Sequence, residues 1–172
     1  KNALATHHDN PELINDGTQT APSKRIEKAL EGKYRYNKPN TIEKVTEVII
    51  ETYKNGGKVI FAGNGGSAAD AQHLAAELVG RFKKTRRPIS AFALSTDSSI
   101  VTSVGNDFGY EKVFSRQLEA YANDDDIFIG FTTSGMSKNI LEALYTCKLK
   151  GVTSIIFTGN ASNNVEQLCD HI

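Results

Sequence analysis

The feature that most constrains the fold is an alternation of short apolar runs with longer segments of helical periodicity. Four apolar runs cover residues 58–62, 88–94, 126–132 and 153–159. Strands that are apolar along their whole length are typical of a parallel sheet covered by helices on both faces. The sequence therefore predicts an α/β fold, a three-layer doubly wound sandwich with a mainly parallel five-stranded sheet. In such folds, function concentrates at the carboxyl ends of the strands.

Capping residues and spacing place the helices between these strands. Helices are expected at 40–55, at about 110–122 and at 138–150. A further helix is expected to begin directly after the glycine turn that follows the first strand. Asn40 and Glu43 have the spacing of an N-cap and its third helical position. Residues 163–172 indicate a short helix leading into the fifth strand, and we expect the domain to continue past Ile172.

Residues 1–39 differ from the remainder and are predicted to form a polar N-terminal arm, with the domain proper at 40–172. The arm holds three of the four prolines and no sustained apolar period. One short helix is expected at 23–31. The pair His7 and His8 is interpreted as part of a solvated arm or a tag remnant rather than as a metal site.

The composition narrows the class of protein. Twenty basic residues balance twenty acidic residues, which gives no sign of a nucleic-acid or membrane surface. No apolar run approaches the ~18 residues that a membrane span needs. Two cysteines, Cys147 and Cys169, lack the spacing of a metal site. We expect two reduced thiols and a cytoplasmic protein, and a single disulfide is the alternative.

Two strand ends carry turns suited to an anion. Residues 63–67 (GNGGS) lead directly into a helix, where glycines let backbone N–H groups approach a ligand. A tight strand-to-helix turn explains the same pattern. The stretch TTSGMSKN is more specific, because a plain N-cap needs one hydroxyl whereas four are present, Thr132, Thr133, Ser134 and Ser137. These residues predict a cradle for a phosphate monoester.

A third loop is expected near the end of the second strand. Asn106 and Asp107 follow Gly105 there and are candidates to hydrogen-bond sugar hydroxyls. A turn stabilised by Asn and Asp side chains is the alternative.

The helix after the glycine turn carries one polar stripe along an alanine-rich body. Steps of three and four residues place Asp70, His73, Glu77 and Arg81 in one file. The opposite side, which is expected to face the core, carries Ala68, Ala71, Ala75, Leu78 and Phe82. A His and a Glu four residues apart are suited to binding a divalent cation or to proton transfer. A solvated ion-pair ladder has the same spacing. The nearby phosphate and sugar candidates favour the functional interpretation.

Four stretches together resemble the phosphoheptose isomerases of the sugar isomerase (SIS) domain superfamily. They are GNGGSAADAQHLAAELVGRF, ALSTDSS, GNDFGYEKVFSRQLEA and TTSGMSKNILEAL, and the likeness runs from about 56 to 159. The resemblance implies a flavodoxin- or Rossmann-like sheet of five strands in a homotetramer with sites between subunits. It also implies conversion of D-sedoheptulose 7-phosphate to D-glycero-D-manno-heptose 7-phosphate, the first step toward ADP-heptose for lipopolysaccharide core or surface glycan.

The resemblance also implies roles for individual residues. Glu77 is similar to the catalytic glutamate that moves a proton between C1 and C2 through an enediol. His73 and Glu77 resemble zinc ligands, with one zinc per site, and Asp70 is placed to orient His73. The implied substrate-binding residues are Asn64, Gly65, Gly66, Ser67, Arg81, Asn106, Asp107, Thr132, Thr133, Ser134 and Ser137. A second catalytic histidine and a glutamine zinc ligand are expected beyond Ile172, and His171 is not assigned to that role.

Other functions remain as alternatives. A non-catalytic SIS-domain protein would bind a phosphosugar, or the bacterial replication initiator as an assembly platform, but the initiator-binding relative lacks the carboxylate at the position of Glu77. A dinucleotide-binding domain is disfavoured because Ala68 replaces the third glycine of that fingerprint and Asp97 comes about a dozen residues late. Phosphosugar-sensing regulators usually lack the helix with His73 and Glu77.

Overall fold

The computed structural model describes residues 41–160 and 163–172, which fall within the compact unit Lys38–Ile172. Several expectations lie outside the described residues. They are the polar arm at 1–39, its short helix at 23–31, the pair His7 and His8, and the cap at Asn40.

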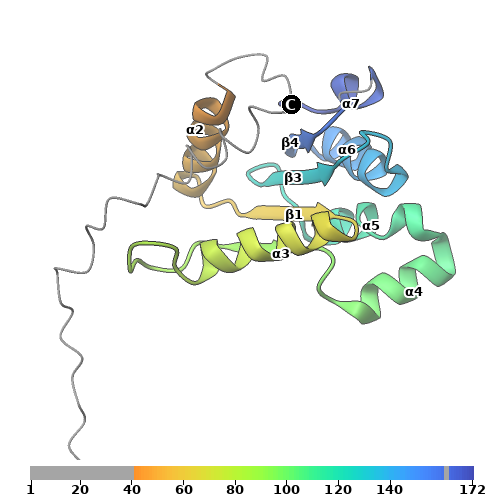
Figure 1. Ribbon diagram of the computed structural model, residues 1–172, viewed down its shortest axis with the longest axis horizontal. Helices are drawn as coiled ribbons and strands as arrows, with labels where there is room; N and C mark the ends of the chain where they lie inside the picture. The colour runs from red at the N-terminus through yellow and green to blue at the C-terminus, as the bar shows by residue number, and fades with distance from the viewer. Residues whose placement is uncertain (1–40, 161–162) are drawn as a thin grey trace, which may run out of the picture. The chain divides into compact units, whose positions relative to one another are not determined.

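Four parallel strands form one sheet in the spatial order β2-β1-β3-β4. Figure 1 shows β1, β3 and β4 side by side in this order. The strands are β1 (Val59–Gly63), β2 (Ala91–Ala93), β3 (Ile127–Thr132) and β4 (Thr153–Thr158). The α-helices are α2 (Thr41–Lys54), α3 (Gly66–Val79), α4 (Ser98–Phe108), α5 (Ser115–Tyr121), α6 (Lys138–Lys150) and α7 (Asn163–Leu168), and η2 (Tyr110–Lys112) is a short 3₁₀ turn. The predicted parallel α/β class is confirmed.

The strand order places a topological switch point between β1 and β3. From β1 the chain crosses first to β2 on one side and then to β3 on the other. In open parallel sheets the crevice outside the carboxyl ends of such strands is where ligands bind. The turn after β1 and the turn after β3 therefore flank the expected binding edge.

A fifth strand position is marked by a single residue. Ile155 of β4 forms an isolated parallel bridge with His171, and the Ile156 N–H donates to the His171 carbonyl at 2.9 Å. The described residues thus form four strands and this bridge, where five strands were expected.

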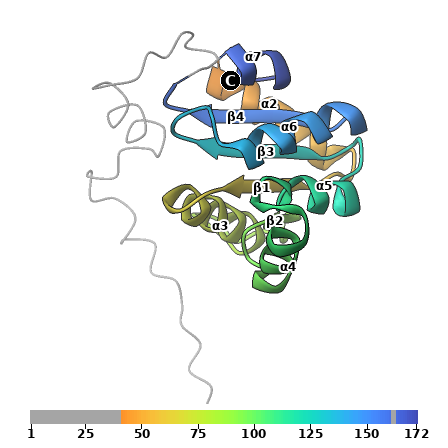
Figure 2. The same ribbon diagram turned by 90° about the vertical axis from the view of Figure 1, so that its right-hand side faces the viewer.

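Two buried clusters fill the space above and below the sheet, giving the predicted three layers. One joins the sheet to α2 and α3 through Val45, Ala71 and Ala75. The other joins it to α5 and α6 through Leu118 and Leu144. Figure 2 shows α6 in front of β3 and β4 with α2 behind them. Since β1 and β3 are covered on both faces, their apolar residues need no polar alternation.

The helix α4 occupies the segment around residues 105–107 that was expected to be a loop. Asp97 caps it, because the Asp97 carboxylate accepts the Ile100 N–H at 2.9 Å. Val101 and Val104 pack against the main buried cluster from this helix. The expected helix at 110–122 is in turn divided into η2 and α5. An N-cap followed by apolar residues at helical spacing was the available signal for α4.

Both cysteines are free thiols, as expected. Cys147 is buried in α6, and burial raises the pKa of its thiol to about 12. Burial also raises the pKa of the Cys169 thiol. Within 41–160 and 163–172, no helix has the length and apolar character needed to cross a membrane.

Candidate functional site

The turn between β1 and α3 is built so that its outer surface stays open. A Cβ on Gly63 would lie 2.4 Å from the Ser67 carbonyl oxygen, so only glycine allows the helix to start so close to the strand. Gly65 has φ 55 and is the N-cap of α3, with no side-chain cap. A Cβ on Gly65 or Gly66 would meet nothing within 4 Å. Open space beside a helix amino end is suited to an anion.

The turn between β3 and α6 brings the predicted hydroxyls together. The Thr132 and Ser137 hydroxyls are hydrogen-bonded at 3.0 Å, and Thr132 is buried. The Ser134 hydroxyl accepts the Met136 N–H at 3.1 Å, and Thr133 is exposed. Ser137 is the N-cap residue of α6 but its side chain makes no cap hydrogen bond.

Electrostatics at the start of α6 also favour an anion. The first turn contains no acidic residue and begins with the exposed Lys138. A lysine beside the partial positive charge of a helix amino end is unfavourable unless a negative group is nearby. A phosphate bound against this turn would supply that negative charge.

An asparagine pair that the sequence did not single out joins these two turns. The Asn64 Nδ2 donates to the Asn139 Oδ1 at 2.9 Å, and the Asn139 Nδ2 donates to the Asn64 Oδ1 at 2.8 Å. The Tyr110 hydroxyl donates to the same Asn64 oxygen at 3.2 Å. Asn139 is buried and directly follows TTSGMSK in the sequence. Its place in the first turn of α6 was the only sequence feature that could have pointed to this contact.

Asn106 and Asp107 lie in the last turn of α4, so the expectation of a loop at these residues is wrong. Both side chains are exposed, and the Asn106 Nδ2 donates to the Asp107 carboxylate at 2.8 Å. Gly109, with φ 92, then turns the chain into η2. The pair remains at the carboxyl edge of the sheet, one turn before Tyr110.

His73 and Glu77 face one another on α3, as the spacing predicted. The His73 Nε2 lies 3.7 Å from the Glu77 Oε1, with side-chain exposures of 73% and 30%. The Glu77 Oε2 is buried and has no hydrogen-bond partner, the only such side-chain atom among the described residues. Asp70 was expected to orient His73, but Asp70 is exposed and no hydrogen bond joins the two side chains among the described residues. A buried carboxylate oxygen without a partner is costly unless a ligand or a proton meets it.

The predicted stripe ends before Arg81. The helix α3 ends at Val79, since the Gly80 N–H returns to the Ala76 carbonyl and Gly80 leaves the helical conformation. The Arg86 guanidinium donates to the Glu77 and Leu78 carbonyls at 2.9 and 2.8 Å and so closes the last turn. Arg81 therefore lies in the following loop, exposed, with its Nη1 donating to the Thr85 hydroxyl at 3.2 Å.

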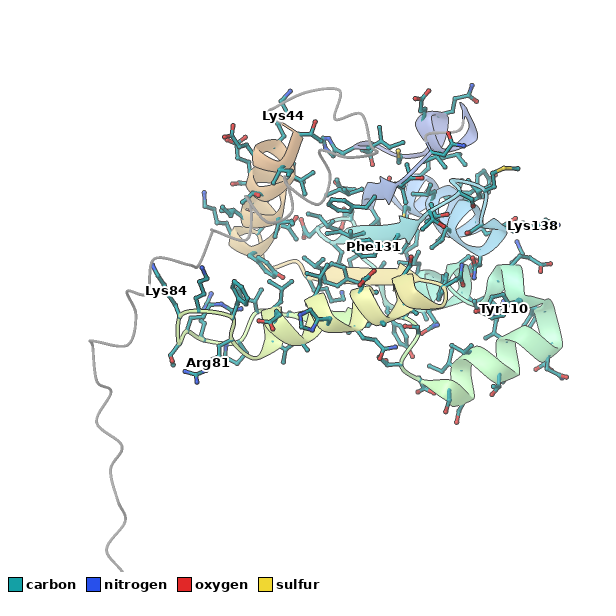
Figure 3. The ribbon with its side chains drawn as sticks, viewed as in Figure 1. Lys44, Arg81, Lys84, Tyr110, Phe131 and Lys138 are labelled. Atoms are coloured by element: carbon teal, nitrogen blue, oxygen red, sulfur yellow. The ribbon has the colours of Figure 1, made fainter. Side chains whose placement is uncertain are left out.

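Phe82 was expected to face the core, and this expectation is wrong as well. Its side chain lies beyond the end of α3 and is 59% exposed. Figure 3 shows Arg81 and Lys84 at one end of α3, with Tyr110 and Lys138 beyond its other end. The turns that begin α3 and α6 therefore lie at one end of α3, and the basic loop at 81–87 lies at its other end. Ten residues of helix from Ser67 to Glu77 correspond to roughly 15 Å.

His73 and Glu77 are the candidate pair of metal donors. Among residues 41–160 and 163–172, no group of three or more His, Cys, Asp or Glu side chains could hold a metal ion. Two ligands of a tetrahedral zinc ion, each about 2.1 Å from it, stand ~3.4 Å apart. The 3.7 Å between the His73 Nε2 and the Glu77 Oε1 is close to this spacing, so these two atoms fit two of the four ligands of such an ion.

Comparisons with known proteins identify the family of this chain. A family model described as SIS domain matches residues 25–159. The phosphoheptose isomerase of Burkholderia pseudomallei (strain K96243) is 53% identical over 130 residues, 76% of this chain and 66% of that protein. The phosphoheptose isomerase of Aneurinibacillus thermoaerophilus is 52% identical over the same shares. The chain thus spans about two thirds of the length of these curated relatives.

Solved structures give the same result. Phosphoheptose isomerase GmhA from Neisseria gonorrhoeae superposes with a TM-score of 0.72 at 34% identity, covering 86% of this chain and 73% of that one. A phosphoheptose isomerase from Francisella tularensis superposes with a TM-score of 0.75 at 30% identity, covering 88% of this chain and 82% of that one.

Proposed function

The chain belongs to the SIS domain family, and from this premise we propose that it acts as a phosphoheptose isomerase. Its reaction would convert D-sedoheptulose 7-phosphate to D-glycero-D-manno-heptose 7-phosphate. The observation that carries the proposal is the Glu77 carboxylate, whose Oε2 is buried without a hydrogen-bond partner on a helix flanked by the glycine turn. Relatives named phosphoheptose isomerase at about half sequence identity support the same activity.

The phosphate is assigned to the turn between β3 and α6. Ser134, Ser137 and the backbone of the turn supply donors, while Lys138 adds positive charge beside the helix amino end. The exposed Thr133 and the buried Thr132 complete the hydroxyl set. The sugar chain extends over Gly65, Gly66 and Ser67 toward Asn106 and Asp107.

Glu77 is assigned the role of general base. An aldose–ketose shift removes a proton from C1 of the ketose, moves the O1 proton to O2 through an enediol, and returns a proton to C2. A carboxylate that lacks a competing hydrogen bond is free to accept and return the carbon-bound proton. Arg81 is assigned to the developing enediolate charge, which a guanidinium stabilises.

A zinc ion is part of the proposal, with His73 and Glu77 as two of its ligands. When bound, it would polarise the sugar oxygens at C1 and C2 as a Lewis acid. His73 would bind through its Nε2, the atom nearest to Glu77. The remaining ligands would come from outside the described residues.

A second copy of the chain is proposed to complete the site, in a homotetramer. Six C–C bonds of about 1.5 Å span at most ~9 Å, so a heptose cannot cover the roughly 15 Å of α3 between Ser67 and Glu77. Its phosphate would in addition lie on the far side of the glycine turn, at the start of α6. A neighbouring copy would bring its own α3 and basic loop to the phosphate-binding edge. We place the enzyme in the cytoplasm, where two free thiols persist.

Substitution of Glu77 by glutamine tests the assignment. Glu77→Gln keeps the side-chain volume and removes the proton-accepting charge, so turnover should fall by a factor on the order of 10²–10⁴ or more while the melting temperature stays unchanged. Glu47→Gln in α2 is the matched control, since Glu47 is exposed and distant in sequence from the site. Turnover by Glu77→Gln equal to that of the control would remove Glu77 from the mechanism.

A further inference from the structure

The buried side chain of Asn139 lies between the two turns assigned to substrate. Asn139 is the second residue of α6, and its side chain is 3% exposed. Its amide forms a reciprocal pair with the Asn64 amide, with N–O distances of 2.9 and 2.8 Å across 75 residues of sequence. One hydrogen-bonded ring thus connects the residue that follows β1 with the first turn of α6.

We propose that Asn139 is a positioning residue that fixes the glycine turn at the distance from the phosphate-binding turn that one phosphosugar requires. This inference rests on the proposed function, because it assigns the phosphate and the sugar to these two turns. Asn139 itself would not touch the substrate. Its effect would pass through Asn64, whose neighbours Gly65 and Gly66 border open space.

The reciprocal pair also fixes which way the Asn64 amide faces. The Asn64 Oδ1 accepts from Asn139 and from the Tyr110 hydroxyl, so both of its lone pairs are in use. The Asn64 Nδ2 donates one of its two hydrogens to Asn139. Its other N–H has no partner among the described residues and is held available to a ligand at the open turn.

A third segment is held by the same contacts. Tyr110 belongs to η2, and η2 is also joined to α6 by the Lys112–Glu142 ion pair at 2.7 Å. Asn106 and Asp107 precede this segment by a few residues, so their position also depends on it. Asn64 therefore joins the turn after β1 to the start of α6 and to η2, and Asn139 is its only buried side-chain partner among the described residues.

Comparison of two ligands separates positioning from general damage. Inorganic phosphate needs only the turn between β3 and α6, whereas D-sedoheptulose 7-phosphate needs both turns at the correct spacing. In Asn139→Ala we expect kcat/KM for the phosphosugar to fall by on the order of 10–100-fold, as misplacement by about 1 Å does. The inhibition constant of inorganic phosphate should stay within about threefold of wild type, because the loss acts through sugar positioning alone.

Asn139→Asp supplies a rescue that only the hydrogen-bonded pair explains. A protonated carboxyl donates to the Asn64 Oδ1 and accepts from its Nδ2, as the amide does, whereas a carboxylate cannot donate. Burial raises the pKa of such a carboxyl, so lowering the pH should bring kcat/KM of this variant closer to that of wild type measured at the same pH. Asn139→Ala should show no such recovery. Asn55→Asp, in the exposed turn before β1, is the matched control and should behave as wild type.

The outcomes distinguish this inference from the function on which it rests. Equal losses for phosphate and phosphosugar in Asn139→Ala, or no loss for either, would overturn the positioning role. An Asn139→Asp variant without acid recovery would do the same, even where Asn139→Ala does not fold. If wild type binds the phosphosugar without isomerising it, the proposed function fails, and the same ligand comparison is made by calorimetry.

Discussion

Gly66→Ala is a perturbation that separates ligand binding from folding. Gly66 is the first residue of α3, its φ is not positive, and an added Cβ would meet no heavy atom within 4 Å. Alanine at a compatible helical position stabilises a protein by about 0.4–1 kcal/mol, chiefly by restricting the unfolded chain. For a chain of this length that corresponds to a rise in melting temperature of roughly 1–4 °C.

The same methyl group should harm ligand binding. It would occupy the open space where the phosphosugar is proposed to approach the backbone, so we expect its dissociation constant to rise by at least about tenfold. Calorimetric titration with D-sedoheptulose 7-phosphate and thermal unfolding of the free protein are the two assays. Wild-type affinity in Gly66→Ala would refute the placement of the ligand over this turn.

Gly63→Ala is the contrasting control for this experiment. Its Cβ would lie 2.4 Å from the Ser67 carbonyl oxygen, a backbone atom that cannot rotate away. Overpacking of this kind costs about 1–3 kcal/mol, so Gly63→Ala should lower the melting temperature as well as the affinity. If the ligand binds over this turn, Gly66→Ala raises the melting temperature and lowers the affinity, whereas Gly63→Ala lowers both.

Three further substitutions or titrations test other parts of the molecule. Ser134→Ala should weaken inorganic phosphate binding several-fold with little change in kcat, and unchanged phosphate inhibition would contradict the cradle. Asp126→Ala should lower the free energy of unfolding by about 3 kcal/mol, because the Asp126 carboxylate accepts from the Lys58 N–H, the Lys58 ammonium and the Asn123 N–H; a urea midpoint equal to wild type would contradict this. Since burial raises the pKa of Cys147 from 9.0 to about 12, its stabilising contribution is complete below pH 9.0 and is lost as the pH rises toward about 12. Thiol reagents at neutral pH should therefore label Cys147 only on unfolding, and rapid labelling of folded protein would contradict its burial.

The strands and most helices were predictable because each is specified by local sequence. The run at 127–131 contains only apolar residues and glycine. The helix α6 ends at Lys150, and its C-cap Gly151 adopts φ 71 as such a glycine does. The helix α4 was missed because its three serines, its threonine and its glycine resemble a loop in composition. Asp97 and the spacing of Val101 and Val104 outweigh that composition once the helix packs on the core.

The site was predictable where its residues are close in sequence. His73 and Glu77 face one another because one helix carries both, and Thr132 and Ser137 meet within one turn. Contacts between residues far apart in sequence were not predictable from local spacing. Asn64 and Asn139, for example, are brought together because β1 and β3 are parallel neighbours in the sheet. Arg81 was misplaced because the effect of Gly80 and the closure of α3 by Arg86 are not visible in a periodic pattern.

The most direct test of the proposed function is to follow D-sedoheptulose 7-phosphate by nuclear magnetic resonance in the presence of the purified protein. We expect the ketose to be converted to D-glycero-D-manno-heptose 7-phosphate, with a new aldose C1 signal and loss of conversion in Glu77→Gln. An unchanged ketose, under conditions where the protein binds it competitively with inorganic phosphate, would contradict the isomerase assignment and identify a phosphosugar-binding protein without this activity.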